Sequence, residues 1–334
     1  MSENKGLLSA GLGMVARNKR YIFWFWLLNL TLAEFGAAAF RRSAHAILDH
    51  SLYAGQLVHG LHVSVLGEML ARPEFGPMQS VTMPAMYFAI LFFIATALFL
   101  PGVFQGYAST YRLPREDFFR ACGRNLWRFI RLMIVAGIVM GIFTGILFGI
   151  NGAISKKAGE STNELLSFQL QMIGLAVIFL VMTTLRIWFD LAEADVVLND
   201  QRAVRKSIGS AFRHTFRSLF RLLVSYVGAT IVAAIILVGG LWIWMKLVPA
   251  ESVFGAFVVA QITLLLLLIP RFWQRGMAVA YWEQKMVAQL EPIRSIVPQP
   301  VAVAPVAEPQ LTPVGSAPDS PPADPQTPPA APEA

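Results

Sequence analysis

Acidic residues gather after the fourth apolar stretch of this chain. Four carboxylates lie there: Asp190, Glu193, Asp195 and Asp200. Clusters of this kind at the end of a membrane helix hold Mg²⁺ in some lipid-headgroup and prenyl transferases, but those enzymes need a second acidic motif on another helix. The corresponding positions, Gly106 and Gly276, carry no carboxylate. Arg186 stands four residues before Asp190, so the spacing favours an ion pair at the helix end over a lipid-modifying active site.

A single carboxylate, Glu34, lies within the first apolar stretch, about 9 Å from the end of that stretch by helical rise. An ionised carboxylate is costly at such a depth and is by default a functional candidate. Arg41 and Arg42 follow closely enough to pair with it. Two interpretations stay open: a role for Glu34 in transport or proton relay, and a local ion pair.

Histidines gather between the first two apolar stretches. The segment contains His45, His50, His59 and His62, together with Asp49 and Glu68. Zinc or copper binds such donors, but the spacing matches no standard site, and a helix at the membrane interface accepts histidine readily. We therefore assign no metal site to this segment.

The third apolar stretch carries glycine at every fourth position. The four residues are Gly137, Gly141, Gly145 and Gly149. Glycine along one helical face lets a second helix approach backbone to backbone, which favours association where no hydrophobic effect operates between helices. This most specific motif of the chain predicts a tight helix-packing contact, either within the chain or in a dimer. A hinge or a pore lining is the alternative interpretation.

The commoner catalytic motifs are missing from the sequence. It contains no GxxxxGK[ST], HExxH, GxSxG or CxxC pattern, so ATP hydrolysis and the commoner hydrolytic reactions lack their residues. The single cysteine, Cys122, makes neither an intramolecular disulfide nor, by itself, a thiolate metal site. We assign no catalytic residue, no cofactor and no metal.

The composition is that of a membrane protein. Of the 334 residues, 56% are hydrophobic and 14% are charged, whereas soluble domains average roughly 45 to 50% apolar and about 25% charged residues. The formal net charge is +7, and the basic residues flank apolar runs. Binding of nucleic acid requires a soluble basic face, so we expect anionic lipid headgroups as the counter-charge and no nucleic-acid partner.

Six stretches are long and apolar enough to cross a bilayer, which requires about 20 residues of helix. Their approximate bounds are residues 21–40, 84–105, 132–150, 166–189, 222–247 and 252–272. The sequence therefore predicts an all-α polytopic membrane protein with six transmembrane helices.

The distribution of lysine and arginine predicts the orientation. With six spans, 21 of the 27 basic residues fall on the side that holds both termini. The other six are Arg41, Arg42, Arg72, Lys156, Lys157 and Lys246. Because basic residues in short loops stay in the cytoplasm, we expect a multi-pass protein of the inner (plasma) membrane with cytoplasmic termini.

A basic, amphipathic segment precedes each odd-numbered span. Aligned without gaps, the three segments match at three positions: Ala10, Ala121 and Ala211; Val15, Leu126 and Phe216; and Arg20, Arg131 and Arg221. This match predicts a threefold internal repeat, in which each unit consists of an interfacial helix, a span, a loop and a returning span.

Arginines at helical spacing line one face of the second and third segments. They are Arg120, Arg124, Arg128, Arg131, Arg213, Arg217 and Arg221. In the second segment, Phe118, Cys122 and Phe129 lie on the opposite face, so each segment is expected to be an amphipathic helix in the interface. The basic face is interpreted either as a docking surface for a cytoplasmic partner or anionic lipids, or as generic anchoring by arginines that reach the headgroups.

The chain changes character near its end. From Pro298 onward it has twelve prolines and no lysine or arginine. We expect a transmembrane domain over residues 1–296 and a disordered, proline-rich cytoplasmic tail over residues 297–334.

Two basic segments, DFFRACGRNLWRFIRLMI and SIGSAFRHTFRSLFRLLVSYV, and the loop stretch DHSLYAGQLVHGLHVSVLGEMLARPE carry a weak resemblance to a known group. They are similar to uncharacterised six-span bacterial inner-membrane proteins, including the family related to the membrane domain of glycerophosphodiester phosphodiesterases. The resemblance implies the same membrane layout. It implies no catalytic residues, because the phosphodiesterase domain itself has no counterpart here.

Three functional hypotheses follow. The first is a non-enzymatic scaffold, assembly or envelope-homeostasis component, which contacts a second copy or another membrane protein through the glycine face and the cytoplasmic helices. The second is a transporter or permease-like subunit without its own ATPase, supported by the repeat, by Glu34, and by Gln169 and Gln171 in the fourth span. The third is a lipid-modifying enzyme that depends on the acidic cluster.

Overall fold

A computed structural model describes residues 6–49, 63–71, 78–109, 111–159, 164–249 and 252–296. Within these ranges the secondary structure is entirely α-helical. Contacts divide the chain into one compact unit, Met1–Gln289, and a second unit, Leu290–Ala334. The expected proline-rich tail at 297–334 lies outside the described residues. The fold described below is that of the first unit.

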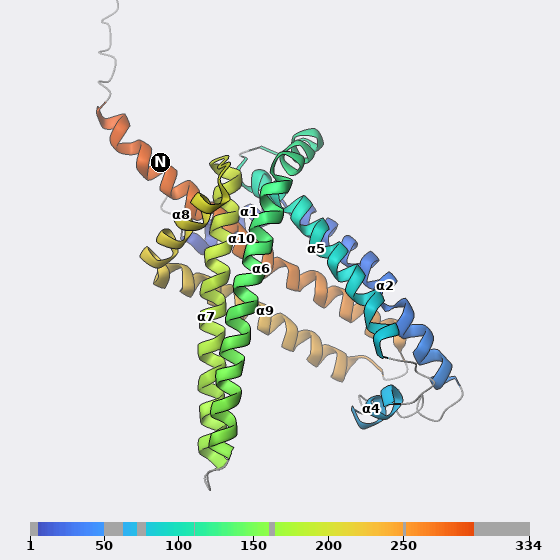
Figure 1. The fold of residues 1–334 in the computed structure, drawn as a ribbon. Coiled ribbons are helices and arrows are strands. Elements are labelled where there is room, and N and C mark those ends of the chain that lie inside the picture. The colour runs from blue at the N-terminus through green and yellow to red at the C-terminus, as the bar shows by residue number, and fades with distance from the viewer. Residues whose placement is uncertain are drawn as a thin grey trace, which may run out of the picture. The chain divides into compact units, whose positions relative to one another are not determined.

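Six long helices form this unit (Figure 1): α2 (Arg20–Leu48), α5 (Met78–Ala108), α6 (Arg115–Gly159), α7 (Glu164–Leu198), α9 (Leu219–Leu247) and α10 (Val253–Ile296). Three shorter helices accompany them: α1 (Leu7–Arg17), α4 (Val63–Ala71) and α8 (Val204–Arg217). All six long helices are long and apolar enough to cross a membrane. The prediction of an all-α protein with six helices able to cross a membrane is confirmed for the described residues.

The long helices pair in chain order as antiparallel hairpins. In the first, Gly36 of α2 lies against Phe88 of α5. In the second, α6 and α7 run side by side (Figure 1), and the Thr144 hydroxyl donates to the Met182 sulfur at 3.5 Å. In the third, between α9 and α10, Gly240 approaches the side chain of Thr263.

The buried core lies at one end of the hairpins, which we call the basic end. It is built from α1, α8, the first turns of α2 and α9, the last turns of α5 and α7, residues 129–132 of α6 and residues 272–282 of α10. Its largest fully buried side chains include Tyr107, Phe104, Phe129, Tyr226 and Phe272. The core therefore joins all three hairpins.

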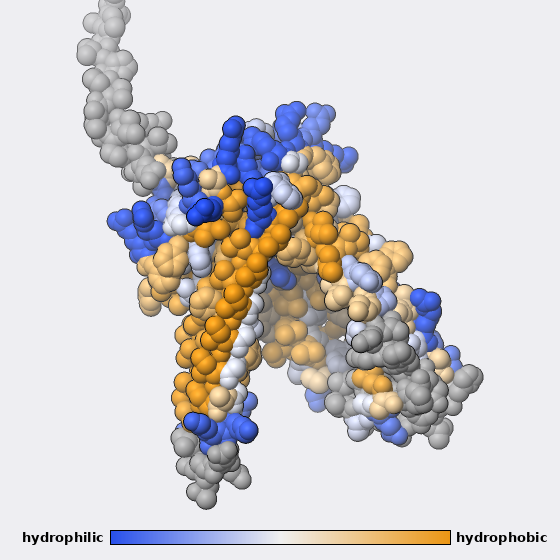
Figure 2. Space-filling view, in the orientation of Figure 1, coloured by the Kyte–Doolittle hydropathy of each residue, from blue (hydrophilic) through white to orange (hydrophobic). Residues whose placement is uncertain are grey.

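The parts of the helices away from the basic end expose apolar side chains. In α6, only 6% of the most apolar window is buried inside the protein, and apolar surface continues along the α6–α7 hairpin (Figure 2). Such a surface is unfavourable in water, but it matches the hydrocarbon of a bilayer. Lipid or another membrane protein is therefore the natural environment of these helix faces.

The first and third basic segments end at the same kind of backbone break. Helix α1 stops at Asn18 (φ −117°, ψ 31°) and α8 stops at Ser218 (φ −122°, ψ 25°), and a long helix follows each break. Asparagine and serine compete with the helix for backbone hydrogen bonds, as the Asn18 side chain does by donating to the Met14 carbonyl at 3.1 Å. The breaks lie 200 residues apart.

The second basic segment differs from its expected form. Residues 115–131 are not a separate helix, because α6 runs without interruption through 45 residues, a length of about 67 Å. Arg128 lies 110 residues after Asn18 and 90 before Ser218, the same spacing as the buried Gly11, Ala121 and Ala211, and arginine is a good helix former. The apolar face of this segment also avoids lipid, since Cys122 and Phe129 are buried in the core.

Two equivalent hydrogen bonds attach the short helices to the ends of returning helices. The Trp188 indole of α7 donates to the Ile208 carbonyl of α8 at 2.9 Å. The Trp273 indole of α10 donates to the Leu8 carbonyl of α1 at 2.8 Å. The two acceptors, Leu8 and Ile208, are 200 residues apart, as are the breaks at Asn18 and Ser218. Helix α8 thus contacts α7 through the same kind of bond that joins α1 to α10. The α1 contact joins the beginning of the first unit to the last of its long helices.

Buried residues recur at the same spacing in the three basic segments. The residues buried at matching positions are Gly11, Ala121 and Ala211; Val15, Asn125 and Thr215; and Ile22, Leu132 and Leu222. By burial, the residue of the first segment that matches Ala121 and Ala211 is Gly11. The gapless sequence alignment had paired them with Ala10, one residue earlier. In each segment a small residue occupies the first of these buried positions.

Glycine is required where α1 crosses α10. A Cβ atom on Gly276 would lie 2.8 Å from the Gly11 carbonyl oxygen. We predict that Gly276→Val destabilises the folded protein by about 1 to 3 kcal/mol, because the added atoms force two backbones apart. The midpoint of chemical unfolding in detergent measures this effect.

Gly239→Val is the matched control, since a Cβ atom on Gly239 would meet no atom within 4 Å. Equal unfolding midpoints for the two variants would show that the α1–α10 crossing is not as close as described.

Candidate functional site

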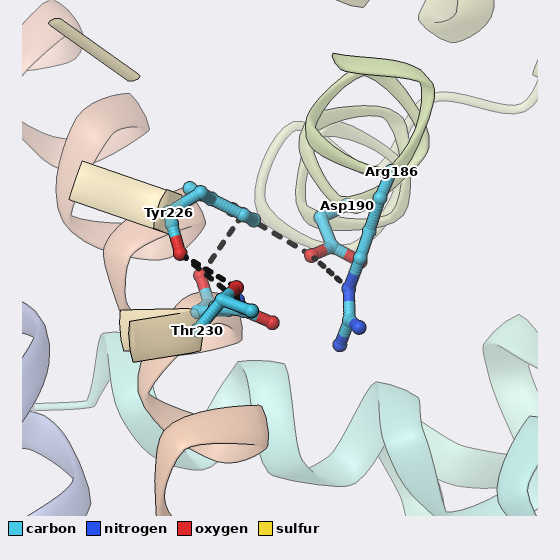
Figure 3. A network of polar contacts seen from close by, with 5 residues as sticks. Arg186, Asp190, Tyr226 and Thr230 are labelled. Atoms are coloured by element: carbon cyan, nitrogen blue, oxygen red, sulfur yellow. Dashed lines mark hydrogen bonds and ion pairs between the residues drawn. The ribbon is translucent and has the colours of Figure 1, made fainter. Parts of the chain in front are cut away.

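A buried polar network links α7, α9 and α10 at the basic end (Figure 3). The Tyr226 hydroxyl of α9 lies 3.1 Å from Asp190 Oδ2 of α7 and 3.0 Å from the Gln274 carbonyl oxygen of α10. A hydroxyl has a single proton, so Tyr226 donates to one of these acceptors at a time. Tyr226 is fully buried, so its hydroxyl pairs with these groups in place of water.

The side chain of Gln274 extends the network. Its amide nitrogen donates to the Tyr226 carbonyl at 3.3 Å and lies 3.1 Å from the Thr230 hydroxyl. Gln274 and Tyr226 therefore exchange contacts in both directions, and the α9–α10 hairpin is fixed at this level. Gln274 lies two residues beyond the expected end of the sixth span at residue 272 and was not predicted to be buried.

Arg186 and Asp190 form the polar edge of this network. Arg186 Nε lies 3.8 Å from Asp190 Oδ2, and the carboxylate side chain is 10% exposed. In Figure 3 the terminal nitrogens of Arg186 point away from Asp190. The ion pair is thus long and engages only the inner nitrogen of the guanidinium group.

The remaining carboxylates of the acidic run point to different partners. Asp195 accepts from the Asn199 amide at 2.5 Å, and Glu193 Oε2 is buried without a hydrogen-bond partner. Asp200 accepts from Arg128 at 2.7 Å, and this hydrogen bond lowers the pKa of Asp200. Among the described residues, no group of three or more histidine, cysteine or acidic side chains is arranged to hold a metal ion.

The predicted basic face remains largely on the surface. Arg124, Arg213 and Arg217 are exposed. The other members have local partners: Arg120 pairs with Asp117 at 3.2 Å, Arg128 with Asp200, Arg131 stacks over Trp127 at 5.0 Å, and Arg221 donates to Gln284 at 3.0 Å. Exposed Phe119, Trp127, Phe212 and Phe216 lie among these arginines, a mixture typical of a membrane interface.

Glu34 lies on the surface of α2. Its carboxylate pairs with Arg41 at 3.0 Å, and about half of each side chain is exposed. This arrangement is the local ion pair, and it does not place the carboxylate in an enclosed path between helices. The role of Glu34 in transport stays a prediction.

The four glycines of α6 form an open face. A Cβ atom placed on Gly137, Gly141, Gly145 or Gly149 would meet no atom within 4 Å. The motif thus makes no close packing contact with another helix in the described part of the chain. Figure 2 shows a pale strip, the colour of near-neutral hydropathy, beside apolar side chains along this hairpin.

The histidine-rich segment is described only in part. His45 Nδ1 lies 3.4 Å from Asp49 on an exposed helical turn. His50, His59 and His62 lie outside the described residues.

Sequence reasoning missed the arginines of α10. Arg271 and Arg275 are one helical turn apart, and Arg271 interacts electrostatically with Arg275, Arg186 and Asp190. Arg186 and Arg271 each lie two residues before a tryptophan, Trp188 or Trp273, whose indole donates to the backbone of a short helix. The repeated Arg-x-Trp spacing was visible in the sequence as a signal for this cluster.

Comparison with protein-family models, characterised proteins and solved structures finds no match to this chain. The residues themselves therefore carry the functional argument.

The buried network leads to a stability prediction. Tyr226→Phe removes the only proton that the hydroxyl shares between Asp190 and Gln274, so we expect a loss of about 1 to 3 kcal/mol in unfolding free energy. Chemical unfolding in detergent measures this loss.

Tyr111→Phe serves as the control, because Tyr111 is 68% exposed and its removal should change stability little. A Tyr226→Phe variant as stable as the Tyr111→Phe variant would contradict the network as described.

Proposed function

We propose that this chain is a non-enzymatic membrane component that assembles with a second copy or another membrane protein through the outer part of α6. The open glycine face at Gly137, Gly141, Gly145 and Gly149 carries this proposal. Four small residues in line leave a groove where a second backbone packs closely, the geometry that favours helix association in lipid.

The surroundings of the glycine face support this function. Ile138, Ile142 and Ile146 of α6 are each more than half exposed, so apolar side chains border the glycines without covering them. A partner helix would gain van der Waals contacts with both the glycines and these side chains.

The proposal includes a unit of construction. We infer that α1 with the first hairpin, the start of α6 with the second, and α8 with the third are copies of one unit. The equivalent breaks at Asn18 and Ser218 and the equivalent bonds from Trp188 and Trp273 support this repeat.

The orientation is part of the same proposal. Because the basic end carries most of the lysines and arginines, we place it in the cytoplasm of a bacterial cell, with the hairpin tips outside. This layout is also that of the six-span inner-membrane proteins that the basic segments resemble. The exposed arginines and aromatics would then meet anionic headgroups.

Substitution of the glycine face tests the proposal. We expect Gly141→Leu combined with Gly145→Leu to abolish the self-association or the co-purification of a partner seen with the wild-type chain. The folded monomer should keep its stability, since a Cβ atom at either position would meet no atom within 4 Å. Cross-linking in native membranes, followed by purification and mass determination, measures the assembly.

Gly239→Leu on α9 is the control, because its position is equally open but lies off the stripe. If the double variant assembled as the control does, the glycine face would not be the contact.

A further inference from the structure

Three arginines lie on α7 and α10 near the level where the Tyr226 hydroxyl, 3.1 Å from Asp190 Oδ2 and 3.0 Å from the Gln274 carbonyl oxygen, joins these two helices. Arg186 belongs to α7, and Arg271 and Arg275 belong to α10. Arg271 interacts electrostatically with both of the others. Arg271 and Arg275 are spaced i, i+4, so they share one face of α10.

The cluster lacks enough negative charge of its own. Asp190 lies within ion-pair distance of Arg186 alone, and Glu193 interacts with Arg186 and Arg275 without forming an ion pair. Arg271 and Arg275 form no hydrogen bond or ion pair with another residue in the described ranges. Even with both carboxylates ionised, at least one of the three positive charges is uncompensated.

Polar atoms beside the cluster also lack partners. Tyr107 is fully buried, its hydroxyl has no hydrogen-bond partner, and it interacts electrostatically with Arg275. Arg275 Nε is likewise buried without a partner. Buried hydroxyl and guanidinium groups are normally hydrogen-bonded, because an unpaired polar group costs free energy. A bound acceptor would satisfy both donors.

We propose that Arg186, Arg271, Arg275 and Tyr107 bind a phosphate group between α5, α7 and α10. Guanidinium groups hold phosphate oxygens through paired, charge-assisted hydrogen bonds, and the terminal nitrogens of Arg186 already point away from Asp190 (Figure 3). Two sources share this chemistry: the headgroup of an anionic phospholipid and a soluble phosphate. The site does not depend on the glycine face, so either proposal can fail alone.

Ligand-dependent stability tests the site on the full-length protein in a neutral detergent. We expect dioleoylphosphatidylglycerol or inorganic phosphate to raise the Tm of the wild-type chain by about 5 °C near saturation. Stabilisation by the lipid alone assigns the site to a headgroup, and stabilisation by phosphate alone assigns it to a soluble anion. Stabilisation by neither overturns the proposal.

A matched pair of double variants separates the site from general surface charge. The double variant Arg271→Gln with Arg275→Gln should bind the stabilising ligand with an affinity at least about tenfold lower than the wild type. Lys156→Gln with Lys157→Gln removes the same charge from the exposed far end of α6 and should leave the affinity unchanged. An equal loss of affinity in both double variants, or no loss of affinity in the first, overturns the proposal.

A single variant supplies a readout that a purely structural role would not give. The Arg271 side chain is exposed and forms no ion pair, so Arg271→Gln removes mutual repulsion among the arginines. Without phosphate or anionic lipid, the variant should therefore have a higher Tm than the wild type. With the ligand near saturation, the order should reverse. A variant less stable than the wild type in the absence of ligand would contradict the site.

Discussion

The helices of this protein are held together where backbones come close at one end of the bundle, because lipid supplies no hydrophobic effect between apolar helices. Two contacts show how this is done. At Gly11 and Gly276, the missing side chains let α1 cross α10, and the Trp273 indole bonds the Leu8 carbonyl beside the crossing. Trp188 makes the equivalent bond to α8. The buried core of the three hairpins depends on these junctions, whereas the opposite parts of the helices stay available to lipid or a partner.

The polar network and the arginine cluster are consequences of the same packing. Once the ends of α7 and α10 are drawn into the core, Asp190 and Gln274 lose contact with water, and Tyr226 replaces it as their donor. Arg271 and Arg275 are brought beside Arg186 in the same way. The proposed phosphate would then complete the charge balance of a site that the core itself creates, while the open face of α6 serves assembly elsewhere on the molecule.

Hydrophobic length alone was enough to predict the six long helices, because crossing a bilayer requires a continuous apolar helix. The basic segments were also visible, but periodicity could not show that the second one continues into α6, since this depends on Arg128 standing where Asn18 and Ser218 break the other two. Of the polar network and the arginine cluster, the sequence indicated only Arg186 and Asp190. Its other members come from α5, α9 and α10, and no spacing along one helix reports a contact between helices.

Cysteine cross-linking between α1 and α10 tests most directly whether the close junction at the basic end holds the fold. In a Cys122→Ala background, cysteines at Leu8 and Trp273 should be joined in high yield by a short thiol reagent, since the Trp273 indole reaches the Leu8 carbonyl at 2.8 Å. Cysteines at Leu8 and Phe254 should not be joined, because Phe254 lies about 28 Å along α10 from Trp273 by helical rise. No cross-link at the first pair, or equal yields at both pairs, would contradict the account.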